Sequence, residues 1–396
     1  MAVRRDSGRS FFAFYLPAAI LYDLVAPMRI LQVSSARTFG GGERHVADLC
    51  RGLAERGHDV FVALRPTNEW QHRLSFLPPE NIAHISIRNS FGIISSLRIA
   101  DFVRQNGIEI VHAHVARDYI PASIACLAAQ SAKFVLTRHV MFPLKPFNRF
   151  ALQNIATAIG VSGPVGAGLR RVFPREKVTV IPNGLDVNSI AADEREKMRR
   201  DFRDFHAIPH DVPLVGTLGE LKELKGQRDF VLSAAEVVKE FPEVHFVVVG
   251  KDNSADRGFR RELRRLVGVL GMKDRFLWLD WIDDTDSFFS AIDIFVSPSH
   301  SESFGLAILE AMAHGKPIVA TATDGARELF GRKAELVEIG DPVALAKSIG
   351  EFLADESSCA NCGEQNRKIA GEKFSLKRMI DETEELYRRI LGNSNT

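Results

Sequence analysis

The sequence predicts an α/β protein built from two doubly wound, largely parallel sheets. From Met28 onward, short apolar segments alternate with longer amphipathic ones, which is the pattern of strands joined by helices. These segments form two series, separated by a charged stretch at residues 191–204 that contains no strand pattern. The length of 396 residues is enough for two domains. We therefore expect two Rossmann-like domains that face each other across a cleft.

The first series predicts the sheet of an N-terminal domain. Each apolar segment is short, as a buried parallel strand should be. The strands are expected at residues 30–34, 60–64, 108–113, 134–137, 158–161 and 178–181. The amphipathic segments between them predict helices at residues 43–56, 95–105 and 120–130.

The second series predicts a C-terminal sheet, with strands at residues 213–218, 245–249, 276–279, 294–296, 317–320 and 334–337. A run of good helix formers follows Gly305 and ends at Gly315, and a last helix at residues 376–391 lies beyond the sheet. In such sheets, ligands bind at the carboxyl ends of the strands. Functional residues are therefore expected where the predicted strands end.

The composition is that of an ordinary globular protein and not of a nucleic-acid binder. Basic residues number 51 and acidic residues 50, so the net charge is +1. The four cysteines do not form a disulfide framework in a chain of this length, and they fit a reducing compartment. We expect a cytoplasmic protein without a nucleic-acid partner.

The first 27 residues form a separate extension. Three arginines precede an apolar run at residues 11–22, which is broken by Pro17. This run is short for a membrane span, and no convincing small-x-small cleavage site follows it. Three interpretations remain open: a misassigned start before Met28, a peripheral membrane foot, or a signal or spanning segment.

Two glutamates flank the start of a predicted helix in the second domain. Glu302 is expected in the loop before the helix, and Glu310 roughly two turns into it at about 3.6 residues per turn. Between them lie the free N–H groups of the helix start, at residues 304–306, which suit an anion. A phosphate there, with a carboxylate for hydroxyl groups on either side, would accommodate a nucleotide sugar.

A glycine loop follows the first predicted strand. Gly40, Gly41 and Gly42 precede a helix and would let main-chain amides approach a ligand closely. The loop is not the G-x-G-x-x-G dinucleotide motif, and no acidic residue ends the second strand. This argues against hydride transfer.

Histidines follow two other strands. His139 ends a strand at the expected cleft, where an imidazole could polarise a hydroxyl group or bind the transferred sugar. His112 and His114 alternate along another strand and therefore share one side of it. No carboxylate or third histidine lies in register with them, so we expect no metal site there.

Residues 299–320, S-H-S-E-S-F-G-L-A-I-L-E-A-M-A-H-G-K-P-I-V-A, resemble the glutamate-pair segment of the retaining glycosyltransferases of family four, which have the GT-B fold. Further matches run in the expected order from Met28 to the last helix. They include the glycine loop, the Pro182-Asn183-Gly184 turn at the domain junction, and Lys225-Gly226. The resemblance therefore covers both predicted domains.

The resemblance implies roles for individual residues. Glu310 would bind the ribose hydroxyls of a nucleoside diphosphate sugar and Glu302 the sugar hydroxyls, while Lys225 would clamp the diphosphate. In full, it implies donor binding by Gly41, Gly42, Lys225, Glu302, Phe304, Gly305, Leu306 and Glu310, and catalytic roles for His139, Lys225 and Glu302. It implies no cofactor and no metal, and Asp284-Thr285-Asp286 is interpreted as a helix cap and not as a metal motif.

One position departs from the family pattern. Glu220 stands where the family has an arginine beside the diphosphate. This is a charge reversal, because a carboxylate repels phosphate. Lys222 could supply the missing cation if its side chain turns into the cleft.

The resemblance also implies the organisation and activity of the whole chain. Residues 1–27 would be the extension, 28–190 the acceptor-side domain, 191–374 the nucleotide-sugar domain, and 375–396 a helix that crosses back to the first domain. The expected activity is retaining transfer of a hexose to an acceptor hydroxyl of a glycan or lipid-linked acceptor, in cell-envelope polysaccharide or glycolipid synthesis at the inner face of the membrane. The alternatives are a UDP-sugar epimerase of the same fold and a non-catalytic nucleotide-sugar-binding protein.

Overall fold

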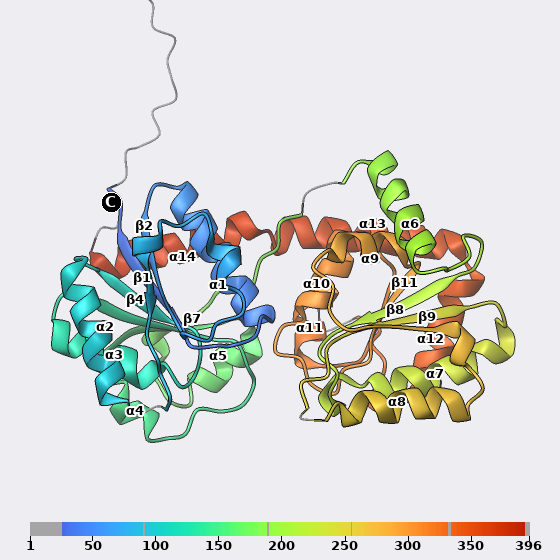
Figure 1. Cartoon of the computed structure of the whole chain (residues 1–396), viewed down its shortest axis with the longest axis horizontal. Helices are drawn as coiled ribbons and strands as arrows, with labels where there is room; N and C mark the ends of the chain where they lie inside the picture. The colour runs from blue at the N-terminus through green and yellow to red at the C-terminus, as the bar shows by residue number, and fades with distance from the viewer. Residues whose placement is uncertain (1–25, 90–91, 188–189, 255, 332–333, 393–396) are drawn as a thin grey trace, which may run out of the picture.

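The structure, a computed structural model, describes residues 26–89, 92–187, 190–254, 256–331 and 334–392. Two α/β domains lie next to each other along the long axis of the molecule (Figure 1). One contains a parallel sheet of seven strands and the other a parallel sheet of five, which confirms the predicted fold class. The predictions for residues 1–25, most of the N-terminal extension, fall outside the described residues.

The first sheet has the strand order β3-β2-β1-β4-β5-β6-β7. Its strands are covered on both faces and therefore consist of nearly continuous apolar residues, which is why six of them were predictable. β3 has no predicted counterpart, because its three residues are too few and too exposed to form an apolar run. The strands are β1 (Arg29–Ser34), β2 (Asp59–Leu64), β3 (Ile82–His84), β4 (Ile110–Ala113), β5 (Lys133–Arg138), β6 (Ile155–Gly160) and β7 (Val178–Val180).

Helices cover both faces of this sheet. Leu31 of β1 belongs to the same buried cluster as Ile99 of α2, whereas Ile30 belongs to a second cluster with Leu49 of α1. Neighbouring residues of a strand point to opposite faces, so the two clusters lie on the two sides of the sheet. The helices are α1 (Gly41–Glu55), α2 (Ile93–Gln105), α3 (Tyr119–Ala129), α4 (Asn148–Ala151) and α5 (Gly163–Leu169), with 3₁₀ turns η1 (Gln71–Leu74), η2 (Pro79–Asn81) and η3 (Arg175–Lys177).

The second sheet has the order β10-β9-β8-β11-β12. The prediction of a strand at residues 334–337 is wrong. In this described segment, Val337 alone pairs, through an isolated bridge with Thr321. The strands are β8 (Leu214–Leu218), β9 (His245–Val249), β10 (Phe276–Leu279), β11 (Ile294–Ser297) and β12 (Ile318–Ala320).

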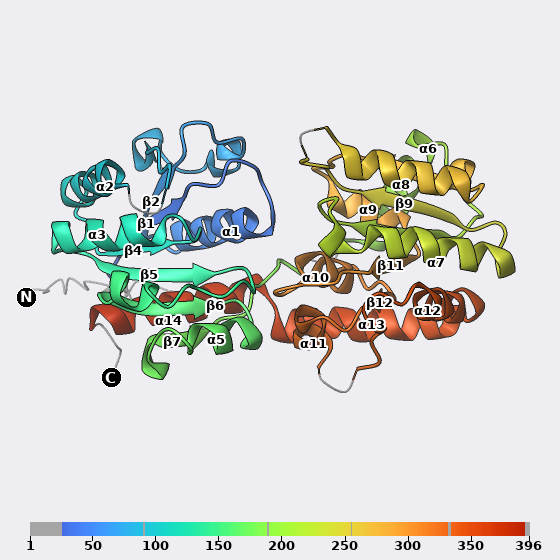
Figure 2. The ribbon, with the colours of Figure 1, turned by 90° about the horizontal axis from the view of Figure 1, so that it is seen from below.

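The helices of the second domain connect these strands and cover the sheet (Figure 2). They are α6 (Ala192–Phe205), α7 (Gln227–Glu240), α8 (Gly258–Val269), α9 (Thr285–Ala291), α10 (Leu306–Ala313), α11 (Asp324–Phe330), α12 (Pro342–Ala354) and α13 (Glu356–Lys373), with 3₁₀ turns η4 (Glu223–Lys225) and η5 (Lys273–Arg275). The charged segment that separates the two predicted series forms α6.

The last helix, α14 (Leu376–Leu391), follows α13 and crosses from the second domain onto the first (Figure 1). Its buried Met379 and Tyr387 belong to the same cluster as Ile30 of β1. Arg56, which follows α1, forms ion pairs with Asp381 at 2.5 Å and Glu384 at 2.6 Å. The C-terminal helix is thus an integral part of the first domain.

Within the described part of the chain, none of the helices combines the length and apolarity that a membrane crossing requires.

Candidate functional site

The glycine-rich start of α1 in the first domain faces the start of α10 in the second domain. A Cβ atom added to Gly41 would lie 2.9 Å from Leu306 Cδ1, so glycine permits the close approach. The neighbouring Gly42 packs against the ring of His139, with 3.7 Å from its Cβ position to the ring. The structure therefore gathers Gly41, Gly42, Leu306 and His139 at the domain boundary.

The start of α10 is suited to an anion. Its N-cap is Gly305, at φ +92°, where a glycine avoids backbone strain and provides no capping side chain. The first N–H groups of the helix therefore remain without a side-chain cap. Because the helix begins at Leu306, Glu310 lies only a little over one turn into it. The expectation of two turns is wrong.

Lys225 and Glu302 lie in direct contact in the second domain. Lys225 Nζ is 2.5 Å from Glu302 Oε1, and the Ser299 hydroxyl donates to the same oxygen at 2.9 Å. The glycine after Lys225 is required, because Gly226 has φ +67° and a Cβ there would overlap the Pro298 carbonyl oxygen. This close packing holds η4 against the end of β11, and so places Lys225 beside Glu302.

The turn after β12 contacts the main chain of Glu302 and holds it in place. Thr323 caps α11 by accepting from the N–H of Ala326, and the N–H of Gly325 donates to the Glu302 carbonyl at 3.0 Å. The turn therefore has a structural role in fixing the glutamate loop.

Glu310 forms an ion pair with Arg44 of α1, across the domain boundary. Burial raises the pKa of Glu310, and the charge of Arg44 opposes that rise. No sequence motif marked Arg44 as a functional residue. Its position directly after the Gly40-Gly41-Gly42-Glu43 motif, in the first turn of α1, was the available signal.

The side chain of Phe304 is not available to a ligand in the cleft. It is 3% exposed and packs against the ring of Phe374, with 5.7 Å between ring centroids. Of the three helix-start residues predicted to bind the donor, Phe304 can therefore contribute only its main chain, whereas Leu306 is partly exposed.

Glu220 is paired with cationic and polar neighbours. It accepts from Lys222 Nζ at 2.5 Å and from Asn253 Nδ2 at 3.1 Å. Burial would raise the pKa of Glu220, but these hydrogen bonds outweigh it and the pKa is lowered. Lys222 is thus paired with Glu220, whose carboxylate offsets the lysine charge. All three residues line a pocket of about 500 Å³ at the ends of β8 and β9.

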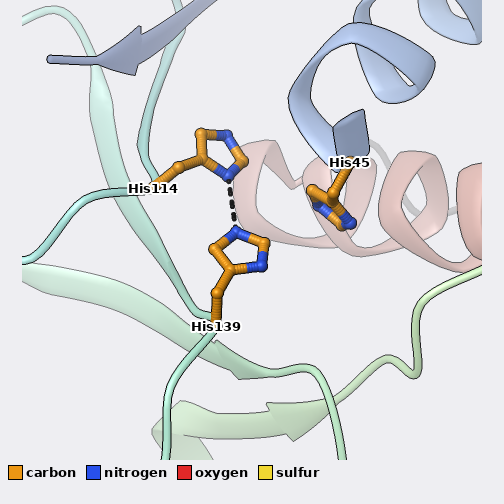
Figure 3. A group of neighbouring side chains, drawn as sticks. All are labelled: His45, His114 and His139. Carbon is orange, nitrogen blue, oxygen red and sulfur yellow. Dashed lines mark hydrogen bonds between the residues drawn. The ribbon is translucent and has the colours of Figure 1, made fainter. Parts of the chain in front are cut away.

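Four histidines gather on the other side of the domain boundary. Figure 3 shows His45 of α1 facing His114, which follows β4, and His139, which follows β5. His114 Nδ1 lies 3.3 Å from His139 Nε2, and the rings of His112 and His114 are 4.2 Å apart. The expectation that His114 lacks further histidine neighbours is wrong, because α1 and β5 supply two.

Burial keeps these imidazoles neutral. It lowers the pKa of His45 to about 4, although a hydrogen bond with Asn183 opposes the shift. Burial followed by the neighbouring histidines lowers the pKa values of His114 and His139 well below the usual value. Near pH 7, each ring therefore carries one N–H group and one nitrogen with a lone pair that can accept a hydrogen bond.

Two family profiles match the chain in succession. Residues 39–189 match "Glycosyltransferase Family 4", and residues 198–369 match "Glycosyl transferases group 1". Together they span most of both domains.

Two curated relatives match this chain over most of their own length. The lipopolysaccharide core biosynthesis glycosyltransferase LpsE of Rhizobium meliloti is 25% identical over 346 residues, which covers 86% of this chain and 94% of that protein. A D-inositol 3-phosphate glycosyltransferase of Xylanimonas cellulosilytica is 27% identical over 386 residues, which covers 86% of this chain and 88% of that protein.

Solved structures share the fold. A glycosyltransferase from Rickettsia africae superposes with a TM-score of 0.80 at 23% identity, covering 93% of this chain and all of that one. Anabaena Alr3699/HepE, in complex with UDP and glucose, superposes with a TM-score of 0.77 at 20% identity, covering 90% of this chain and 98% of that one. These similarities confirm the predicted GT-B arrangement.

Proposed function

Because this chain belongs to the group 1 and family 4 glycosyltransferases, we propose that it transfers a hexose from a nucleoside diphosphate sugar to an acceptor hydroxyl, with retention at the anomeric carbon. The observation that carries the proposal is the contact between Lys225 and Glu302 beside the uncapped start of α10. It places a cation, a carboxylate and free N–H groups within one small region.

The departing diphosphate would be stabilised by Lys225 and by the N–H groups at the start of α10. Both are positioned by glycines with positive φ, Gly226 and Gly305, and so are organised before the donor arrives. Glu302, which holds Lys225 in the absence of donor, would then bind sugar hydroxyls. In this proposal the diphosphate charge is balanced by protein groups and not by a divalent metal at the phosphates.

Glu310 would bind the ribose hydroxyls. One oxygen of its carboxylate, Oε1, is paired with the Arg44 guanidinium. A ribose must therefore share the carboxylate with Arg44 or displace the guanidinium. Donor binding is thereby coupled to the contact between the two domains.

The acceptor would enter on the side of the first domain, near Gly42 and His139. Gly42 packs against the His139 ring, and the adjacent Gly41 contacts Leu306 of the second domain. These residues therefore line the first-domain side of the contact between the domains. The neutral His139 can exchange hydrogen bonds with the transferred sugar or the incoming hydroxyl, while the departing phosphate takes the acceptor proton.

We further propose that the acceptor is membrane-associated and belongs to cell-envelope glycan or glycolipid synthesis. LpsE acts in lipopolysaccharide core biosynthesis by its name. The first domain also exposes apolar side chains on three neighbouring helices, α2, α3 and α4: Ile93, Ile94, Leu97, Ile124, Leu127 and Phe150. Arg98 and Arg149, both exposed, lie among them and would attract anionic lipids.

The first test is a thermal-shift screen of the full chain against UDP, GDP and ADP and their common sugar conjugates. A ligand that binds only the folded state raises its stability, so one nucleotide set should raise the melting temperature. The matching donor is then incubated with candidate lipid-linked acceptors, and released nucleotide and anomeric configuration are measured.

The products separate the candidate functions. Released nucleotide with an α-configured glycoside from an α-linked donor supports the proposal. A free, altered nucleotide sugar would identify an epimerase, and stabilisation without turnover on any acceptor would identify a binding protein. No stabilisation by any nucleotide would overturn the assignment of the donor site.

A further inference from the structure

We propose that His45, His114 and His139 form a binding site for a divalent transition-metal ion, zinc above all, on the first-domain side of the cleft. The three side chains come from α1 and from the ends of β4 and β5, and converge on one another (Figure 3). The site is separate from the proposed diphosphate position, which lies on the second domain at Lys225.

The spacing of the nitrogen atoms fits a shared ion. One ligand atom from each of the three histidines lies within 4.8 Å of the others. His114 Nδ1 and His139 Nε2 are 3.3 Å apart. Two imidazole nitrogens bound at about 2.0 Å to a tetrahedral zinc ion are separated by roughly 3.3 Å, so this pair already has the required distance.

The outer nitrogens are held as they are in metal sites. His45 Nδ1 lies 2.9 Å from Asn183 Oδ1, and His114 Nε2 lies 2.7 Å from Gln32 Oε1. An amide oxygen only accepts hydrogen bonds, so both histidines carry their proton on these outer atoms. This leaves lone pairs on His45 Nε2 and His114 Nδ1, the arrangement in which ligating histidines are usually oriented by a second hydrogen bond.

His45 supplies an independent observation. Its Nε2 atom is buried and has no hydrogen-bond partner among the described residues, although the side chain is only 6% exposed. A buried acceptor without a partner is costly and calls for an explanation. A bound cation would provide the missing partner.

Two adjustments complete the site. In the absence of an ion, His139 Nε2–H donates to His114 Nδ1, so metal binding requires the His139 proton to reside on Nδ1 instead. His112 does not join the ligands, because its two nitrogens are engaged by Tyr387 and Thr137. Three imidazoles therefore bind the ion, and a fourth position is left for water or another ligand.

The ligand set predicts which ions bind. Neutral imidazoles favour zinc, cobalt, nickel and copper, whereas magnesium and calcium prefer oxygen ligands.

The test is direct metal binding to the full chain after treatment with a chelator. Zinc affinity is measured by competition with a chromogenic chelator, and Co²⁺ is added to read the visible absorption of a tetrahedral or five-coordinate site. We expect one high-affinity equivalent of zinc, tetrahedral-type Co²⁺ bands, and no competition by magnesium. Neither readout depends on sugar transfer, so its failure is distinguishable from failure of the proposed function.

Two ligand variants and one control assign the site. His45→Gln and His139→Gln should each weaken zinc binding at least 10-fold, whereas His84→Gln, at an exposed histidine of β3, should leave the affinity unchanged. Circular dichroism and melting in chelator show whether each variant is folded. Wild-type protein that binds no zinc, or folded ligand variants that bind it as tightly as the control, would overturn the proposal.

Discussion

Arg44 of the first domain and Glu310 of the second form an ion pair that spans the domain boundary. The Glu310 side chain is 8% exposed and that of Arg44 35%, so the carboxylate depends on this partner for most of its charge compensation. A residue expected to bind the donor is thus engaged, in the free protein, by the opposite domain. Donor binding and the contact between the domains therefore share one carboxylate.

Glu310→Gln is expected to weaken nucleotide binding by about 10- to 100-fold. A hydrogen bond to a charged group contributes about 1.5–3 kcal/mol, and the amide loses both the charge and one acceptor site. Isothermal titration with the nucleotide found by thermal shift measures the effect. The matched control is Glu351→Gln on the exposed face of α12, where the side chain is 65% exposed. Equal affinities of the two variants would contradict the proposed ribose contact.

Lys225→Met is expected to lower kcat on the order of 100-fold, with a smaller change in donor KM. A cation beside the diphosphate acts mainly as negative charge develops on the leaving group. Steady-state kinetics of nucleotide release separates the two constants. Lys239→Met, near the end of α7 with a 64% exposed side chain, is the control. A change confined to KM would show that Lys225 binds the ground state alone.

Glu220→Gln is expected to tighten donor binding several-fold at low ionic strength. The substitution removes a negative charge near the expected diphosphate and releases Lys222 from its 2.5 Å ion pair. Titrations at two salt concentrations measure the effect, which should shrink at the higher one because exposed charges are screened. Loss of binding or turnover in this variant would show that the carboxylate has a role of its own.

Glu384→Gln is expected to destabilise the junction of α14 with the first domain by about 1 kcal/mol at pH 7, a value reduced for solvent screening. Burial alone would raise the pKa of Glu384, but hydrogen bonds from Arg388 and Arg56 lower it to about 2. Since the folded pKa lies below the ordinary value of 4.5, the stabilisation is present above pH 4.5 and is lost as the pH falls toward 2.

Thermal melts of the Glu384 variant from pH 7 to pH 2 test this linkage. The wild-type protein should lose more stability than Glu384→Gln between pH 4.5 and 2. Glu385→Gln changes the adjacent exposed residue and should follow the wild-type curve. Parallel curves for wild type and Glu384→Gln would rule out the linkage.

The double variant Ile93→Ser and Ile94→Ser is expected to reduce binding to anionic lipid vesicles several-fold. These side chains are 68% and 71% exposed on α2, and each buried apolar side chain contributes to insertion at the membrane surface. Co-sedimentation with vesicles containing an acidic phospholipid measures the bound fraction. Val343→Ser, at a 67% exposed position on α12, is the control. Identical sedimentation of the wild type, the double variant and the control would exclude this face as a membrane-binding surface.

The strands were predictable because parallel strands covered on both sides are continuous apolar runs. β1 and β2 differ from their predicted ranges by one residue each. The short edge strand β3 and the segment at residues 334–337 show the limit of this signal. Three residues give no pattern, and of residues 334–337 only Val337 pairs with the segment after β12, which is too short a contact to extend into a strand.

The donor loop was predictable in part because its signals are local. Glu302 and Gly305 mark a helix start in the sequence, and Lys225-Gly226 marks a turn with a cation. Their contact at 2.5 Å between Lys225 and Glu302 joins positions 77 residues apart, which only the packing of η4 against β11 could establish.

By itself, the sequence determined the two α/β domains, the family and the loops at the ends of the strands, because apolar periodicity, turn residues and short motifs act over a few neighbouring positions. Only the tertiary structure decided that Arg44 pairs with Glu310, 266 positions away, and that His45 joins His114 and His139. Which charges pair and which imidazoles lie close together depends on how separate elements pack. A local sequence pattern contains no information about such long-range contacts.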